Sequence, residues 1–116
     1  IIGYAEVSSM SSIIMQAAHR RLLMPHTRFM VHYGDMCIES NSVSVKSAVD
    51  ENERLNRLML EIYSNRCSVG KGFKDRSKTR IKKFLDTKMR QKQEWYMSAE
   101  EAIQYGFADD IYKGEQ

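Results

Sequence analysis

Hydrophobic positions recur along the chain at two spacings, which predict helices alternating with short strands. Apolar residues three and four positions apart predict a first helix over 8–24, which ends before Pro25. The β-branched and aromatic run over 27–33 predicts a short buried strand, and residues 34–41 form a polar, irregular stretch. Strands that alternate with helices predict the α/β class.

The pattern over the second half of the chain predicts three more helices. The first, over 42–66, would be roughly 36 Å long at 1.5 Å per residue, enough to project from the domain and pack against a neighbouring subunit. A loop over 68–75 leads to a basic amphipathic helix over 77–89. Ser98, with Glu101 three residues later, predicts a capping box for a last helix that ends at Gly106, before a closing strand over 108–112.

Composition limits the class of protein. The chain has 116 residues, of which 42% are hydrophobic, and this suits one globular domain. It opens on Ile1 and Ile2, without an initiator Met or a basic-then-apolar leader, so we expect a piece cut from a longer chain in mid-strand. Cys37 and Cys67 are widely spaced, which excludes a disulfide framework or a cysteine zinc site and predicts a reducing, cytoplasmic compartment.

Charge is distributed unevenly. Residues 66–92 contain eleven Lys or Arg against Asp75 and Asp86, a net charge of +9, whereas the rest of the chain carries −6. A basic block of this size could bind nucleic acid through phosphates, but its two aromatic residues, Phe73 and Phe84, are not interleaved with the charges as a stacking surface needs. We therefore favour a solvated surface helix, and expect neither a nucleic-acid partner nor a membrane.

Two residues are candidates for nucleophilic chemistry. Ser9 lies in a run of serines, 8–12, at a predicted strand-to-helix turn, where unpaired N–H groups and the helix dipole favour an oxyanion. A serine there is more often a helix cap, and residue types alone leave open which serine reacts. His32 ends an apolar strand and suits a general base, whereas His19 and His26 are weaker candidates.

Three segments resemble the ClpP family of serine peptidases, in that family's order. Residues 5–18 (AEVSSMSSIIMQAA) are similar to its nucleophile segment, and residues 25–32 (PHTRFMVH) to its strand and catalytic histidine. Residues 95–111 (WYMSAEEAIQYGFADDI) are similar to its C-terminal helix and strand. The order nucleophile, histidine, acid also differs from that of other serine hydrolase folds.

The resemblance implies a fold, a mechanism and a site. The fold would be the C-terminal part of a ClpP/crotonase-like spiral of ββα units, forming a single catalytic domain over 1–116 with an insertion over 66–92. The activity would be serine endopeptidase, with Ser9 as nucleophile, His32 as base, Glu94 as acid and the Met10 N–H in the oxyanion hole. No metal or organic cofactor is implied.

The resemblance also implies partners. The substrate would be a protein or peptide, and the protein would form a homo-oligomeric ring in which the helix over 42–66 makes contact between rings. An ATP-dependent unfoldase would be a further partner for a cellular enzyme. Capsid or scaffold proteins would be the substrates if the basic stretch marks a phage head-maturation peptidase.

Departures from the family pattern keep other interpretations open. Glu94 stands where the family usually has aspartate, with Asp86 as an alternative acid, Ser11 replaces a glycine, and Tyr33–Gly34 replaces a common Gln-Pro. These changes leave a catalytically inactive ClpP-like subunit as the alternative. An acyl-CoA enzyme of the crotonase type is disfavoured, because it has no use for an ordered Ser and His pair. Since the family's glycine-rich strand is absent, we expect the 116-residue piece alone to be poorly active.

Overall fold

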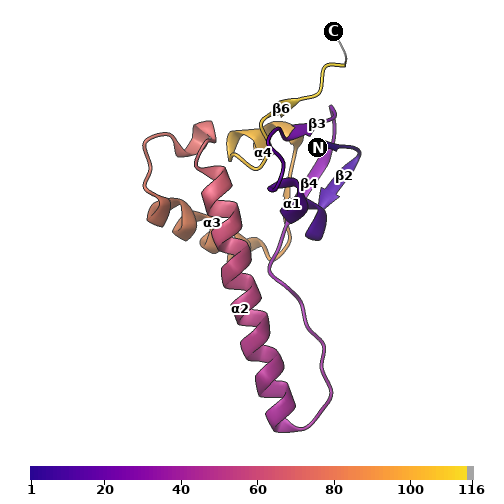
Figure 1. The fold of residues 1–116 in the computed structure, drawn as a ribbon, viewed down its shortest axis with the longest axis vertical. Coiled ribbons are helices and arrows are strands. Elements are labelled where there is room, and N and C mark those ends of the chain that lie inside the picture. The colour runs from indigo at the N-terminus through magenta and orange to yellow at the C-terminus, as the bar shows by residue number, and fades with distance from the viewer. Residues whose placement is uncertain (115–116) are drawn as a thin grey trace.

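A computed structural model describes residues 1–114, and it confirms the α/β class. Strands and helices alternate along the chain (Figure 1). The strands are β1 (Ile2–Gly3), β2 (Glu6–Ser8), β3 (Leu22–Leu23), β4 (Arg28–Val31), β5 (Trp95–Met97) and β6 (Asp110–Ile111). The helices are α1 (Met10–Met15), α2 (Ser42–Cys67), the 3-10 turn η1 (Lys71–Phe73), α3 (Lys78–Lys92) and α4 (Ala99–Gln104). Within residues 1–114, no helix is both long and apolar enough to cross a membrane.

The strands form two small sheets. One has the order β1-β3-β6 with parallel pairing throughout. The other has the order β2-β4-β5, in which β2 and β4 are parallel and β4 and β5 are antiparallel. Val7, Phe29 and Met97 of the second sheet are buried in the core. Their neighbours Glu6, Arg28 and Tyr96 are exposed, as the two-residue period of a strand requires.

Aromatic side chains make up much of the core between the sheets and the helices. Phe107 packs against Phe29, Tyr63 and Trp95, with ring centroids 5.3–5.7 Å apart. Phe73 of η1 extends this cluster from the other side of the core. Such edge and tilted contacts add to the free energy gained by burying the rings.

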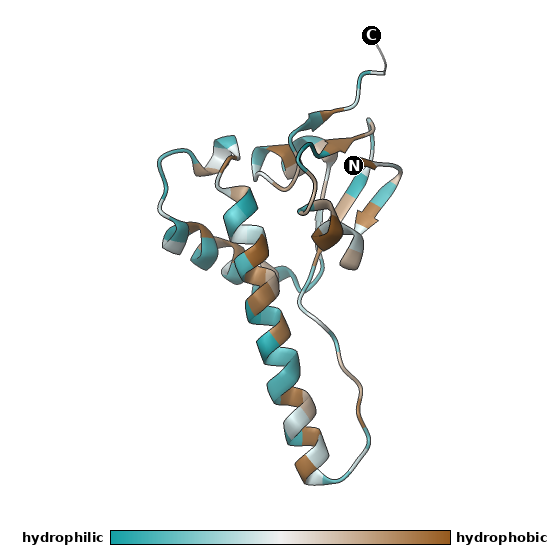
Figure 2. Ribbon diagram, viewed as in Figure 1, coloured by the Kyte–Doolittle hydropathy of each residue, from teal (hydrophilic) through white to brown (hydrophobic). Residues whose placement is uncertain are grey.

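Helix α2 is the longest element, and its first half projects from the domain (Figure 1). Asn41 caps it by accepting a hydrogen bond from the Ser44 N–H at 3.0 Å. Brown, apolar turns continue into the projecting part (Figure 2), where the side chains of Val43 and Val49 are 75% and 38% exposed. The predicted helix over 42–66 is thus confirmed, together with its projection from the domain.

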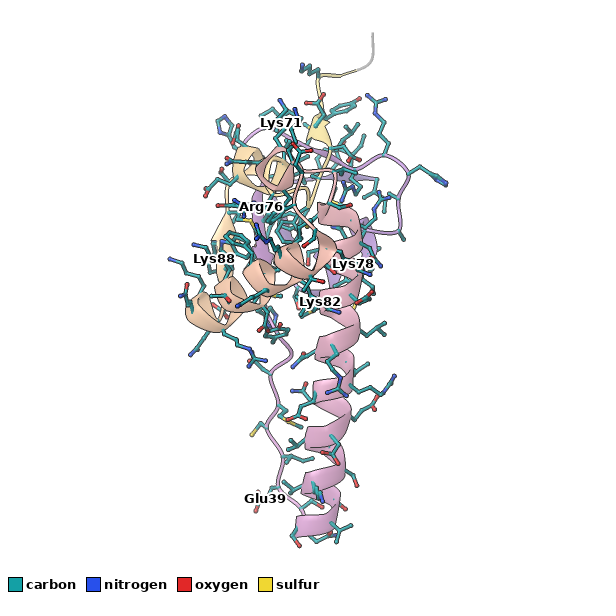
Figure 3. All side chains as sticks on the ribbon, turned by 90° about the vertical axis from the view of Figure 1, so that its left-hand side faces the viewer. Glu39, Lys71, Arg76, Lys78, Lys82 and Lys88 are labelled. Atoms are coloured by element: carbon teal, nitrogen blue, oxygen red, sulfur yellow. The ribbon has the colours of Figure 1, made fainter. Side chains whose placement is uncertain are left out.

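Helix α3 carries much of the basic stretch and packs on α2. Lys78 and Lys82 of α3 both bind the Glu61 carboxylate of α2. Both lysines are labelled in Figure 3, on the side of α3 that lies next to α2. Hydrogen bonds from these two ammonium groups lower the pKa of Glu61 to about 2. Part of the positive charge over 66–92 is therefore balanced within the domain. The predicted helix over 77–89 is confirmed, with Ser77 as its cap.

The predicted first helix over 8–24 is wrong beyond residue 15. Helix α1 ends at Met15, and the chain then turns and forms β3, which pairs with both β1 and β6. Arg21 lies in this stretch with a fully buried side chain that bonds Asp109 and the Gly106 carbonyl. Asp109 and Gly106 are distant from Arg21 in sequence. Because Arg21 bonds them, the chain leaves the helical path that the local spacing of apolar residues predicts.

The last helix is confirmed in its cap and in its end. Ser98 accepts from the Glu101 N–H at 3.1 Å, and the Glu101 carboxylate accepts from the Ser98 N–H at 3.2 Å. Gly106 follows the helix with a φ of 83°, where a Cβ would lie 2.4 Å from the Cys67 carbonyl oxygen. The closing strand is shorter than expected, and β5 is a strand that the pattern did not predict.

Candidate active site

Ser9 lies at the turn between β2 and α1 in an unusual backbone conformation. Its φ of 55° and ψ of −120° fall in a region that residues with a side chain rarely adopt. The Ser9 N–H donates to the Met30 carbonyl at 3.1 Å, which continues the pairing of β2 with β4 into the turn. A sharp strand-to-helix turn of this kind exposes the side chain of a nucleophile at the end of a sheet. Ser9 is not a capping side chain, since it makes no cap hydrogen bond.

The buried hydroxyl groups of Ser12 and Tyr63 hold this turn through hydrogen bonds. Ser12 Oγ donates to the Ser9 carbonyl at 2.5 Å, so the Tyr63 hydroxyl is the donor in its own 2.5 Å contact with Ser12 Oγ. Burial raises the pKa of Tyr63 above its usual range, which keeps the hydroxyl protonated. Tyr63 of α2 thereby fixes the carbonyl of the candidate nucleophile.

His32 follows the end of β4 and faces Ser9. Its Nε2 lies 2.9 Å from Ser9 Oγ, and its Nδ1 lies 2.5 Å from the Tyr33 carbonyl oxygen. A carbonyl can only accept, so Nδ1 carries the proton and, in the neutral ring, Nε2 is the acceptor. This tautomer is the one that can take the proton of the Ser9 hydroxyl.

Glu94, the predicted acid of the triad, directly precedes β5 and is hydrogen-bonded to a residue other than His32. The pairing of β4 with β5 ends at Val31 and Trp95, so His32 and Glu94 flank this last pair, each just outside its strand. The Glu94 carboxylate accepts from the Tyr96 hydroxyl at 3.3 Å, and no hydrogen bond joins it to His32 among residues 1–114.

Asp86, the alternative acid, does not contact His32 either. Its carboxylate accepts a short hydrogen bond from the Tyr33 hydroxyl and another from Arg90 Nε at 3.0 Å. Burial, and then the bond to Asp86, raise the pKa of Tyr33 above its usual range. Asp86 is therefore linked to His32 only through Tyr33, the residue that follows the histidine.

A mainly apolar pocket of about 290 Å³ opens beside Ser9 and His32. Met10 and Ile13 of α1 form one wall, and the facing turns of α2 form the other. The apolar residues that α2 contributes are Leu55, Leu58, Met59 and Ile62. Asn52 and Asn56 make its polar end. A pocket with a nucleophile and a base at its edge is suited to binding an apolar side chain next to the bond that is attacked.

The other candidates from the sequence are not drawn into this site. His26 lies in a turn with a φ of 66° and lines a hollow of about 450 Å³ that neither Ser9 nor His32 touches. His19 is exposed after α1. Met10 is the first residue of α1, so its N–H has no intrahelical acceptor, as an oxyanion donor requires. Within residues 1–114, no three His, Cys, Asp or Glu side chains gather as metal ligands would.

Comparison with known proteins gives an independent line of evidence. A family model described as Clp protease matches residues 1–115. The chain is also similar to the ATP-dependent Clp protease proteolytic subunit of Chlorella vulgaris, with 28% identity over 106 residues. That alignment covers 90% of this chain and 46% of the relative, so the chain spans less than half the length of the curated relative that it matches.

Proposed function

Because the chain belongs to the Clp protease family, we propose that it carries the nucleophile and base of a serine endopeptidase. The observation that supports this most directly is the 2.9 Å contact between Ser9 Oγ and His32 Nε2, with the proton of the ring on Nδ1. Both groups lie at the edge of a pocket, where a peptide could reach them. An acyl-CoA enzyme of the crotonase type would have no use for the Ser9–His32 pair, so this contact also argues against that alternative.

The proposed reaction begins with attack of Ser9 Oγ on the carbonyl carbon of a peptide bond. His32 Nε2 takes the hydroxyl proton as the new C–O bond forms, and the Met10 N–H binds the developing oxyanion. The imidazolium then gives the proton to the leaving amine as the C–N bond breaks, which leaves an acyl-enzyme. Water, activated by the neutral His32, hydrolyses this ester and restores the Ser9 hydroxyl.

The pocket favours substrates with an apolar residue on the acyl side of the bond. Its wall from α2 is aliphatic, and at about 290 Å³ it has room for a Leu, Met or Phe side chain. Removing such a side chain from water contributes about 1.5–3 kcal/mol. A charged residue at this place would lose hydration without gaining a partner.

Glu94 as the acid of the triad remains a prediction, motivated by its place next to the last β4–β5 pair and not supported by its hydrogen bond. Its carboxylate is bonded to the Tyr96 hydroxyl, so the proposal rests on Ser9 and His32. Glu94→Gln keeps the size of the side chain and removes its charge. If Glu94 orients the imidazole, this variant lowers the rate of acylation by orders of magnitude.

The experiment for the proposed function is labelling of the intact protein with a fluorophosphonate. We expect a covalent adduct on Ser9, detected by peptide mass spectrometry, that is lost in Ser9→Ala and slowed in His32→Gln. Ser11→Ala, a neighbouring exposed serine, is the matched control and should label at the wild-type rate. No labelling of the folded wild-type protein favours the inactive-subunit alternative, and labelling that survives in Ser9→Ala refutes Ser9 as the nucleophile.

We further propose that the projecting half of α2 packs against a second copy of the chain, as the ring-forming family implies. Its support is the exposed apolar side chains of Val43 and Val49, which lie beyond the domain core. Val43→Lys and Val49→Lys should reduce the sedimenting mass of the protein. Val69→Lys, which changes a 71% exposed valine after the other end of α2, should leave the mass unchanged.

A further inference from the structure

The backbone immediately after His32 is held at both ends of one peptide group. The Tyr33 carbonyl accepts from His32 Nδ1 at 2.5 Å, and the N–H of the same peptide, that of Gly34, donates to Asn56 Oδ1 at 2.9 Å. A peptide group is planar, so a fixed direction for its N–H also fixes the direction of its C=O. Asn56 on α2 thus determines where the acceptor of the His32 proton points.

The same hydrogen bonds also strengthen one another. When the Gly34 N–H donates to Asn56, electron density moves toward the Tyr33 carbonyl oxygen, which becomes a better acceptor for His32. A proline at position 34 would have no N–H to donate, so this arrangement requires a residue other than proline there. Asn52 holds the next peptide, since its Nδ2 donates to the Gly34 carbonyl at 3.3 Å.

Helix α3 holds the other side of this segment through the side chain of Tyr33. The Tyr33 hydroxyl donates to Asp86, and Asp86 also accepts from Arg90 Nε at 3.0 Å. The Arg90 guanidinium lies 5.4 Å from the centre of the Tyr33 ring, within the range of a cation–π contact. Residue 33 is therefore fixed by α3 and its peptide by α2, so the carbonyl has little freedom to turn away from the imidazole.

We propose that the Tyr33–Gly34 peptide group acts as the orienting acceptor for His32, with Asn56 as the positioning residue that holds it. The inference rests on the proposed function, because it assigns a role to the neighbours of the proposed base. It differs from a triad with a carboxylate, since the third partner is a neutral backbone dipole. Among residues 1–114, the Nδ1–H has one acceptor, the Tyr33 carbonyl, and the Glu94 carboxylate is bonded to the Tyr96 hydroxyl.

The test is nitrogen-15 NMR of the histidine ring in the intact protein, together with the rate of fluorophosphonate labelling. In the wild type we expect His32 to show one tautomer, with the proton on Nδ1. Asn56→Ala should give a mixture of tautomers and lower the labelling rate about fivefold, as expected for loss of one hydrogen bond. Asn56→Asp, which keeps an acceptor oxygen in place, should restore both readouts. Tyr33→Phe removes the bond to Asp86 and should also give a mixture.

The controls separate this inference from the proposed function. Asn52→Ala removes a hydrogen bond to the neighbouring peptide and should leave the His32 tautomer unchanged. Unchanged ring signals and labelling in folded Asn56→Ala would overturn the inference, and so would tautomer mixing in Glu94→Gln. If Asn56 controls the tautomer while Ser9 fails to label, the positioning role holds and the peptidase proposal fails.

Discussion

The ion pair between the buried Arg21 and the partly exposed Asp109 gives a prediction whose magnitude follows from the structure. Arg21 Nη2 lies 2.6 Å from Asp109 Oδ1, and Oδ2 accepts from Arg21 Nε at 3.2 Å and from the Arg21 backbone N–H at 2.8 Å. The Arg21 side chain is fully buried, whereas that of Asp109 is 33% exposed. Asp109→Asn leaves a buried guanidinium without the charge that balances it.

Removing one partner of a fully buried ion pair costs about 3–5 kcal/mol. Water reaches part of the Asp109 carboxylate, and Arg21 keeps its bonds to Gln16 and Gly106, so we expect a loss of about 2–3 kcal/mol. For a domain of this size, that lowers the melting temperature by roughly 10–15 °C. Calorimetry or circular dichroism at pH 7 measures this shift.

The pH dependence follows from the direction of the pKa shift. Hydrogen bonds from Arg21 hold the pKa of Asp109 below its usual range in the folded protein. The stabilisation is therefore present above the unfolded pKa of about 4, and it is lost as the pH falls from there through the folded pKa. The difference in melting temperature between wild type and Asp109→Asn should shrink across that range.

An exposed ion pair is the matched control for this prediction. Glu6 binds Arg28 at 3.0 Å, but both side chains are about half exposed, so Glu6→Gln should change stability by less than about 1 kcal/mol. The reasoning is refuted if Asp109→Asn is as mild as Glu6→Gln at pH 7. It is refuted equally if the effect of Asp109→Asn persists undiminished in acid.

Three further changes have defined expected outcomes. Gly106→Ala should destabilise the protein by about 2–4 kcal/mol in guanidinium unfolding, because φ is 83° and the new Cβ would lie 2.4 Å from the Cys67 carbonyl oxygen; a neutral result would contradict the tight approach. Tyr63→Phe should cost about 1–2 kcal/mol in the same assay and slow Ser9 labelling, because the buried bond to Ser12 is lost; unchanged labelling would show that the turn does not need this support. Ser98→Ala should cost about 1 kcal/mol through loss of the helix cap, with a lower urea midpoint and an unchanged slope; an unchanged midpoint would show that the cap is dispensable.

Elements with a strong local signal were predictable from the sequence. Helix α2 has apolar residues at helical spacing over many turns, and α4 begins with a capping box at Ser98, so the sequence predicts both starts to within a residue or two. Strand β4 is also predicted from the sequence, because the run over 27–33 is rich in β-branched and aromatic residues. Each of these signals depends on residues within a few positions of one another.

Elements that depend on distant partners were not predictable in the same way. The apolar spacing continues past Met15, yet Arg21 bonds Asp109 and the strand that follows pairs with β1 and β6. Strand β5 has three residues, too few for an alternating pattern to be distinguished. Local periodicity contains no information on these long-range contacts.

The candidate site shows the same division. Ser9 and His32 were chosen from the sequence on a resemblance, and the structure brings them within hydrogen-bond distance. Asn56 was not singled out, because an asparagine on the polar part of a long helix has no distinctive spacing. Only the folded chain sets its carbonyl against the Gly34 N–H.

The backbone of Ser9 has a consequence for how this chain could change over evolution. At φ 55° and ψ −120°, glycine is the residue with the least strain, so Ser9→Gly should be more stable than Ser9→Ala even though both lose the hydroxyl. A subunit kept only for assembly would gain stability by drifting to glycine at this position. Under the proposed function, Ser9 gives up backbone stability in exchange for its hydroxyl group, and an inactive descendant of this protein should be recognisable by glycine at position 9.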